Sequence, residues 1–599
     1  MASGDLISRV YSNFRGVDFR GEEINLVRSP NSLNIWKDYK ETESIRTRPE
    51  MELLHSFNEK VYGIFFYNDM MIVHSGKKLY KVVNGTKTEL YSGKYEDLSD
   101  GGKRLIRGIN PAPSNAFVYN NVWYFKDGVN YLQYDGTTIG DVVGHIPTTS
   151  ESRTPAGSGK LLEDVNMLSD YRINTFMGDG KSTKFYVDVT DITDIFNIKS
   201  SGIETEYTLA DALMDIKQNG AVVQINGADA DKSGYTWSID YATGCFTITP
   251  APPLPLTDGQ DNVKIRFMKL VDGYADRIRK CTILQVFDSR VFFSGNPDFP
   301  NMVWHCSLND PTYCSDSDCY SEGLDNAKVK GVVAGNNALW VFKEPSQANT
   351  TVFYHTPTID ADYGKVYSPQ HSSIATGCVG KAINFNDDIV FFSDRGMEGI
   401  SGDVTTEQVI AHRSSLVDRK LITERNYKEM LLEEWEGYLL TFIDNKVYLA
   451  DSRAVFTNED HIEYEYFYWE LSKKITCTRV NKGVLYLGTD DGVYSLTDNT
   501  SDVESYWVTP KDKFKHPQYM KTTNKRGCVV EAIGDISVFA KIEDTDFELI
   551  GDYKNITDYF VSRIKRKKFK DIQLKFYSKK RFSLETATLE CFIGGYLKR

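Results

Sequence analysis

A very apolar stretch, a turn rich in Asn, Asp or Gly, and a second apolar stretch recur seven times along the chain. The turns lie at Asn68, Asn120, Asp288, Asn336, Asn386, Glu436 and Asn481. Asn, Asp and Gly tolerate the positive φ values that tight hairpins require. Apolar residues on both sides of each turn predict strands that are buried on both faces, as in stacked sheets.

The spacing of these turns indicates the architecture. Successive turns are 45 to 52 residues apart, except for an interval of 168 residues between Asn120 and Asp288. A β-rich repeat of about 40–50 residues is typical of the four-stranded blade of a β-propeller. We therefore expect an all-β protein with a propeller of about seven blades; unrelated hairpins in β-sandwiches are the alternative.

The long interval holds one blade and about 115 further residues, given a blade of about 45. Strand patterns at 184–189, 221–227 and 263–267 predict an inserted β-sandwich over residues 160–272. The segment Gly178–Thr183 resembles a phosphate-binding loop, but residue 175 is Thr where that loop has Gly, and a strand pattern follows instead of a helix. A Gly-rich hairpin turn is the interpretation that fits.

Alternation of apolar and polar residues in 571–577 and 587–593 predicts a half-exposed antiparallel sheet at the end of the chain. The expected organisation has five parts. They are an N-terminal entry segment (1–51), the first propeller blades (52–159), the inserted sandwich (160–272), the remaining blades (273–507) and a C-terminal β module (508–599).

Charge is distributed unevenly between these parts. Residues 511–599 contain 20 Lys and Arg and 12 Asp and Glu, so their net charge is +8. Because the whole chain has a net charge of −13, residues 1–510 have a net charge of −21. An acidic body repels phosphate backbones, so the main part of the chain is not expected to wrap nucleic acid. The densest basic run is Arg563–Lys570. It is either a solvated part of a surface sheet or a contact to DNA or to an acidic protein surface.

Candidate chemistry is sparse. His305, Cys306, Cys314 and Cys319 lie close together, but their spacing differs from the paired C-x₂₋₄-C of zinc sites, and the carboxylates among residues 316–325 lack the order of an EF-hand. Whether residues 305–325 bind a metal stays open. The only approach to a sialidase Asp-box, Gly234–Trp237, lies in the insert. We expect no catalytic residue, no cofactor and no metal ligand, and hence no enzyme.

Several short motifs resemble the β-propeller nozzle and hub proteins of short-tailed bacteriophages, the tail tubular protein B and DNA-stabilisation protein groups. They are Phe14–Asp18, Ser29–Asn34, Arg46–Glu50, Arg290–Pro297, Asn309–Tyr313, Leu339–Glu344, Gly377–Gly380 and Phe392–Gly396. Members of that family usually have Gly after the Arg-Pro pair, where this chain has Glu50.

The resemblance implies a structural component of a virion, forming part of the tail nozzle or hub ring through which double-stranded DNA is retained and ejected. It implies a homo-oligomeric ring of six copies, contacts with other tail or head–tail connector proteins, passage of DNA without sequence-specific binding, and synthesis in the host bacterial cytoplasm.

Two alternatives belong to other classes: a tail-associated propeller glycosidase or depolymerase acting on host polysaccharide, and a cellular propeller that serves as an interaction platform. No apolar run reaches the roughly 20 residues that span a bilayer, and residues 1–5 lack the order of a signal peptide. We therefore expect no membrane anchor.

Overall fold

The computed structural model describes residues 6–40, 44–99, 102–188, 216–240, 243–269, 271–347, 350–360, 364–401, 409–458, 461–498, 502–565 and 567–596. Strands make up 56% of it and helices 3%. The chain forms two compact units, one of residues 1–92, 335–354 and 370–599, the other of residues 93–334 and 355–369. Within the described residues, no helix combines the length and the apolar composition needed to cross a membrane.

The predicted β-propeller is confirmed, and the described residues form seven four-stranded sheets, which we number as blades 1 to 7. Blade 1 comprises β8 (Val61–Tyr67), β9 (Met70–Ser75), β10 (Lys78–Val83) and β11 (Thr86–Tyr91). Blade 2 comprises β14 (Asn115–Tyr119), β15 (Val122–Lys126), β16 (Tyr131–Tyr134) and β17 (Ile139–Asp141). Blade 3 comprises β27 (Ile283–Phe287), β28 (Arg290–Ser294), β29 (Met302–His305) and β30 (Cys319–Ser321). Blade 4 comprises β31 (Val329–Gly335), β32 (Ala338–Lys343), β33 (Val352–His355) and β36 (Pro369–His371).

The remaining blades follow in chain order. Blade 5 comprises β37 (Ala382–Phe385), β38 (Asp388–Ser393), β39 (Gly396–Ser401) and β40 (Val409–His412). Blade 6 comprises β41 (Leu431–Trp435), β42 (Tyr438–Ile443), β43 (Lys446–Asn458) and β44 (His461–Glu470). Blade 7 comprises β45 (Cys477–Asn481), β46 (Val484–Gly488) and β47 (Gly492–Thr497), and its fourth strand is β7 (Glu50–Ser56) from the start of the chain.

The predicted turns join the first and second strands of every blade. In six of them two consecutive residues with positive φ begin at the predicted position: Asn68–Asp69, Asn120–Asn121, Asp288–Ser289, Asn336–Asn337, Asn386–Asp387 and Glu436–Gly437. In blade 7 the pair is Lys482–Gly483, one residue after Asn481. Two successive positive φ values define the tight hairpin turn whose twist matches that of the flanking strands. The local turn chemistry of the repeat is thus confirmed.

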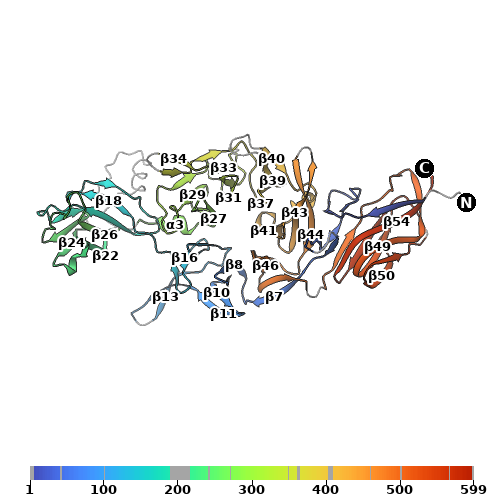
Figure 1. Ribbon diagram of the computed structural model, residues 1–599, viewed down its shortest axis with the longest axis horizontal. Helices are drawn as coiled ribbons and strands as arrows, with labels where there is room; N and C mark the ends of the chain where they lie inside the picture. Colours follow the sequence, from blue (N-terminus) through green and yellow to red (C-terminus); the bar gives the residue numbers. More distant parts are fainter. Residues whose placement is uncertain are drawn as a thin grey trace. The chain divides into compact units, whose positions relative to one another are not determined.

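The inserted sandwich contains a six-stranded and a three-stranded sheet. The first has β18 (Thr148–Arg153), β19 (Lys160–Leu161), β20 (Tyr171–Phe176), β22 (Ile216–Ile225), β23 (Ala228–Asp229) and β26 (Val263–Lys269), and the second has β21 (Lys184–Tyr186), β24 (Thr236–Asp240) and β25 (Cys245–Thr249). Strands β18, β22, β24 and β26 lie together in Figure 1. The first strand begins at Thr148, before the expected boundary at residue 160. The six residues of β18 are almost all polar, so no alternation marks them as a strand.

The C-terminal module is built on one long strand, β49 (Tyr519–Ile542). Its first part pairs with β54 (Phe582–Tyr596), and its second part pairs with β50 (Glu548–Ile556) and β53 (Ile572–Ser578). The register changes beside Gly534, whose φ is +105°. Shorter strands complete the sheet: β48 (Ser505–Val508), β51 (Tyr559–Ser562) and β52 (Lys568–Phe569).

The entry segment does not stand apart from the C-terminal module, as the expected division of the chain implied. Strands β1 (Leu6–Tyr11), β4 (Ser32–Leu33), β5 (Ile35–Lys37) and β6 (Ile45–Thr47) all belong to the module's sheet. β1 pairs antiparallel with β54, and the blue N-terminal strand lies among the red strands in Figure 1. We call the described residues of 6–49 the N-terminal strap. Strands β4, β5 and β6 are too short to show a period, and the six residues of β1 do not alternate between apolar and polar, so these pairings left no trace in the sequence pattern.

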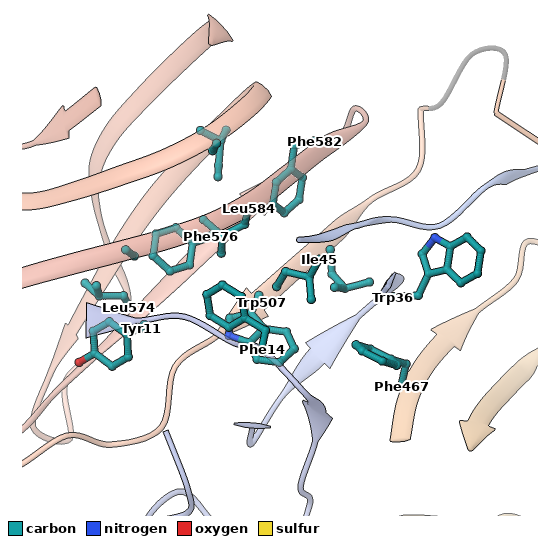
Figure 2. Packing of buried hydrophobic residues seen from close by; sticks show 14 of the residues in the cluster. Tyr11, Phe14, Trp36, Ile45, Phe467, Trp507, Leu574, Phe576, Phe582 and Leu584 are labelled. Atoms are coloured by element: carbon teal, nitrogen blue, oxygen red, sulfur yellow. The ribbon is translucent and has the colours of Figure 1, made fainter. Parts of the chain in front are cut away.

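The strap fills the space between the C-terminal module and blade 6. Trp36, 2% exposed, stacks on Trp435 at 5.4 Å between ring centroids and meets the edge of Trp469 at 5.6 Å. Phe14 packs on Trp507 of β48 at 5.1 Å. Figure 2 shows strap side chains between Phe467 of blade 6 and the apolar side chains of the module. One continuous core therefore joins the strap, two blades and the module.

We expect Trp36→Ala to lower the free energy of unfolding of this unit by about 3–5 kcal/mol, the usual cost of truncating a buried aromatic side chain. Trp36→Phe is the matched control: it keeps an aromatic ring and removes an indole N–H that has no hydrogen-bond partner among the described residues. The free energy of unfolding lost in Trp36→Phe should be much smaller. Calorimetry of the two variants measures both, and equal losses would contradict the stacking argument.

Candidate functional site: the basic cavity of the C-terminal module

The predicted basic run lies between β51 and β52, on the surface of the C-terminal module. Its burial alternates: Arg563 and Lys565 are exposed, while Ile564 is 5% exposed and belongs to the main core. Phe569, later in the run, is also buried in that core. Ile564 and Phe569 therefore anchor the run in the core, while Arg563, Lys565, Lys568 and Lys570 are exposed.

These residues border a cavity of about 150 Å³, which we call the module cavity. Its apolar lining comes from Ala540, Ile542, Leu549, Ile550 and Ile564, and its polar lining from Thr545, Glu548, Arg563, Lys565 and Lys567. Apolar residues of β49 and β50, together with Ile564, therefore line the same cavity as three cations and the carboxylate of Glu548. We call Arg563, Lys565 and Lys567 the basic rim.

Backbone contacts hold the rim in place. Thr523 of β49 is buried; its hydroxyl donates to the carbonyl of Lys565 and accepts from the amide of Lys567, each at 3.3 Å. Its own amide donates to the carbonyl of Lys567. Gly527 lets the same strand approach closely, since a Cβ there would lie 2.1 Å from the carbonyl oxygen of Ser562. The rim is a fixed surface of the module.

The three cations of the rim differ in their electrostatic partners. Lys567 donates to the carboxylate of Glu548 at 2.7 Å, and this contact lowers the pKa of Glu548. Arg563 and Lys565 form no ion pair among the described residues. Lys565 also helps to lower the pKa of Glu548, so the cavity carries three cations and one carboxylate, and an anionic group would still find partners there.

A second cavity, of about 310 Å³, lies in the strap and is lined by Asp18, Arg20, Gly21, Glu23, Ile24, Asn25 and Arg28. Its cations are already matched. Arg28 binds the buried Glu465 through two hydrogen bonds of 2.8 Å, and Arg20 binds Asp18 at 2.8 and 2.9 Å. These pairs tie the strap to blade 6 and leave no charge in excess.

The cysteines considered as metal ligands are core residues of the second unit. Cys306 and Cys314 are buried in one apolar cluster, and Cys319 packs against it. Burial raises the pKa of the Cys306 thiol to about 12 and that of Cys314 well above its usual value. A thiol must lose its proton to bind a metal, and burial opposes that step. Among the described residues no three His, Cys, Asp or Glu side chains converge as a metal site would require.

The Gly178–Thr183 segment is a turn, but not the predicted hairpin, because β20 before it and β21 after it belong to different sheets. One carboxylate oxygen of Asp179 accepts hydrogen bonds from the amides of Lys181 and Ser182, at 2.8 and 2.6 Å. The strand β21 follows directly. The amides that a phosphate would need are bound by Asp179, and no helix stands behind them.

The structure also brings together His412 and two carboxylates at blade 5, a histidine cluster that sequence spacing did not indicate. His412 lies between two carboxylates, contacting Glu398 through Nδ1 at 3.3 Å and Asp418 through Nε2. Burial disfavours the charged imidazolium, but the two carboxylates outweigh it and raise the pKa of His412 to about 10. The hydroxyl of Ser414 donates to Asp418, not to the imidazole. A histidine that is already protonated at neutral pH cannot take a proton from Ser414.

Comparison with known proteins finds distant structural similarity. No protein-family model matches the chain, and no curated protein sequence matches it. The streptogramin B lyase structure has a TM-score of 0.32 at 10% sequence identity, covering 75% of this chain and 98% of its own. BamB from Moraxella catarrhalis has a TM-score of 0.29 at 9% identity, covering 78% of this chain and 94% of its own. Both are β-propeller proteins.

Gly527→Ala should destabilise the C-terminal module more than a left-handed alanine does elsewhere. Gly85 is the matched control, because its φ of +77° is close to the +72° of Gly527 while nothing lies within 4 Å of a Cβ there. Gly85→Ala should cost about 1–2 kcal/mol from the backbone conformation alone. Gly527→Ala adds a clash with the backbone of Ser562, Arg563 and Ile564. Denaturation curves of both variants test this prediction. Equal losses in the free energy of unfolding would show that the backbone of the basic rim moves without cost to accommodate the added Cβ.

His412 should make stability fall at high pH. Its pKa is about 10 in the folded chain against an ordinary value near 6.5, so its contribution is fully present below about pH 6.5 and is lost as pH rises through 10. We expect His412→Gln to flatten the fall in the free energy of unfolding between pH 7 and 10. His461→Gln, at an exposed histidine, is the control and should leave the slope unchanged.

Proposed function

We propose that this protein is a structural component of a bacteriophage virion, part of the tail nozzle or hub ring through which double-stranded DNA is retained and ejected. One observation carries the proposal: three of the motifs that resemble the nozzle and hub family, Phe14–Asp18, Ser29–Asn34 and Arg46–Glu50, lie in or at the end of the N-terminal strap, which packs between the C-terminal module and blade 6. The other five motifs lie in or beside the strands of blades 3 to 5.

Two of the strap motifs illustrate this. In the Phe14–Asp18 motif, Gly16 lies so close to blade 6 that a Cβ would stand 2.0 Å from the carbonyl oxygen of Tyr466. In the Arg46–Glu50 motif, the buried Arg48 donates to the side chain of Asn34 at 2.9 Å and to the carbonyl of Glu470 at 2.9 Å. Both motifs contact blade 6 and so connect the strap to it.

The charge distribution supports a passage for DNA. A body with a net charge of −21 repels the phosphate backbone, so DNA could move past it without bound contacts that resist exit. The module, with a net of +8, could in turn pair with the acidic body of a neighbouring copy. Such charge pairing steers association and fixes its register.

Negative-stain microscopy of the purified full chain tests the proposal. We expect a closed ring or short tube of six copies with a central passage. A compact monomer that cleaves polysaccharide would favour the glycosidase alternative instead, and a monomer without that activity would leave the cellular interaction platform.

Removal of the basic run should weaken assembly. We expect the replacement of Arg563, Lys565, Arg566, Lys567 and Lys568 by Ser to leave the monomer folded and to shift the ring–monomer equilibrium toward monomer. Arg566 lies outside the described residues, and the other four side chains are not part of the apolar core. Lys554→Ser with Lys580→Ser, at exposed cations elsewhere on the module, is the control. Sedimentation velocity at low and high salt measures the shift, and unchanged assembly of the five-site variant would end the charge-pairing idea.

A further inference from the structure

The loop of the inserted sandwich between β25 and β26 holds the densest group of prolines in the chain. Four of the 18 prolines lie within residues 250–255, in the order Pro-Ala-Pro-Pro-Leu-Pro, and Leu256 follows. The ring of a proline fixes its φ near about −65°, and a residue that precedes proline is restricted to extended conformations. Every residue from Ala251 to Pro255 is under at least one of these constraints, and none of them has a positive φ or lies in a helix or strand. These constraints favour a short polyproline II helix. We call residues 252–256 the proline ridge.

Burial along the proline ridge repeats at the third residue, which matches the three residues per turn of a polyproline II helix. Pro252 is buried and Pro255 is half-buried, whereas Pro253, Leu254 and Leu256 are exposed, the two leucines by 67% and 93%. The edge with Pro252 and Pro255 therefore lies against the sandwich. The other edges of the ridge face solvent.

Hydrogen bonds to the sandwich hold the base of the ridge. The carbonyl of Pro252 accepts from the amide of Gly180 at 3.0 Å, and the carbonyl of Pro253 accepts from the side-chain amide of Asn262 at 2.8 Å. Gly178 lets the loop approach closely, since a Cβ there would lie 2.5 Å from the carbonyl oxygen of Pro253. The ridge is thus already ordered, and a partner would not have to impose that order on binding.

The chemistry of the ridge excludes most kinds of partner. A strand cannot pair along it, because prolines lack the amide that a sheet needs. Residues 250–257 carry no charge, and the next charged residue is Asp258, so neither a phosphate backbone nor an anionic membrane is attracted. The ridge offers proline rings, two leucine side chains, and the carbonyls of Leu254 and Pro255, which accept no hydrogen bond among the described residues. Trp and Tyr match all three, because the ring packs on apolar groups while its N–H or O–H can bind a carbonyl.

We propose that the proline ridge is a docking site for a different protein whose groove is lined by Trp or Tyr side chains, and that this groove receives Pro253, Leu254 and Leu256. In this mode of recognition a preformed polyproline II helix loses little conformational entropy on binding. The two cavities of this chain described above have no aromatic lining, which points to another protein as the partner. The inference goes beyond the proposed function and does not depend on the proposed ring, because it concerns the insert and a groove on another molecule.

A WW domain is the probe, because such domains bind Pro-rich segments in an aromatic-lined groove. A WW variant is first selected to bind a synthetic peptide of residues 250–257, and to lose that binding in Pro253→Ala and Leu256→Ala peptides but not in a Pro252→Ala peptide. This variant therefore recognises the exposed edges of the ridge. We expect the purified full chain to bind it at least as tightly as the peptide does, measured by isothermal titration calorimetry, because the ridge of the folded chain is already ordered. Weaker binding than that of the peptide would overturn the inference.

Matched pairs of prolines test the conformation of the ridge. Pro253→Ala with Pro255→Ala frees φ at two positions and should weaken binding of the probe by the full chain at least tenfold. Pro111→Ala with Pro113→Ala, at two exposed prolines with the same spacing, is the control and should leave the affinity unchanged. Thermal melting checks that both variants fold. Leu256→Ser, at a side chain outside the core, should by itself weaken binding about tenfold, the loss expected for one aliphatic side chain. Unchanged affinity in the ridge variants would contradict the proposed contact.

Two further measurements test other occupants of the ridge. We expect the full chain not to sediment with vesicles of phosphatidylcholine and phosphatidylglycerol. Sedimentation with these vesicles that Leu254→Ser with Leu256→Ser abolishes would assign the ridge to a lipid surface and overturn the inference. We also expect this double variant to self-associate as the parent chain does, measured by sedimentation velocity. A loss of self-association would assign the ridge to a second copy and would likewise overturn the inference.

Discussion

The burial of Trp36 between Trp435 and Trp469 is the contact on which the rest of this structure depends. It places the N-terminal strap against blade 6, and the same strap supplies β1, β4, β5 and β6 to the C-terminal sheet. The chain then continues into β7, which completes blade 7. Both the module and the last blade therefore need residues from the opposite end of the chain, so neither can be complete until the two ends have met. Contacts at such sequence separation carry a large loop-closure cost, which the apolar core shared by strap, module and blades must offset.

The parts of this fold that could be predicted from the sequence are those decided by local chemistry. A two-residue hairpin needs two positive φ values at fixed positions, so Asn336–Asn337 or Glu436–Gly437 marks the turn by itself, and repetition of the turn marks the blades. The parts that could not be predicted depend on distant partners. β18 is polar, and β4 and β5 are two and three residues long, so they become strands only because a neighbour is present to pair with.

The same division holds at the candidate site. The cations of Arg563–Lys570 are visible in the sequence. The apolar lining of the cavity is not, because it combines Ile542 of β49 with Leu549 and Ile550 of β50. The available signal in the sequence was the apolar Ile564 between two cations, because an apolar residue inside a basic run indicates that one side of the run is covered. In the structure Ile564 is buried. The histidine cluster of blade 5 had no such signal: His412 meets Glu398 only through the pairing of β39 with β40.

A cavity lined by both cations and apolar residues can separate the attraction that guides a partner from the burial that gives affinity. Charges on the surface act over about 10 Å at moderate salt and lose that reach as salt rises, whereas burial of an apolar side chain does not depend on screening. A contact built on both would form quickly through charge attraction and persist through the apolar part. In a ring every copy makes the same contact, so a modest free energy at each interface is multiplied by closure. In the proposed ring, an acidic body that repels DNA and a basic module that attracts the acidic body would serve one end: the same negative charge would keep the passage free of bound phosphate and draw neighbouring copies together.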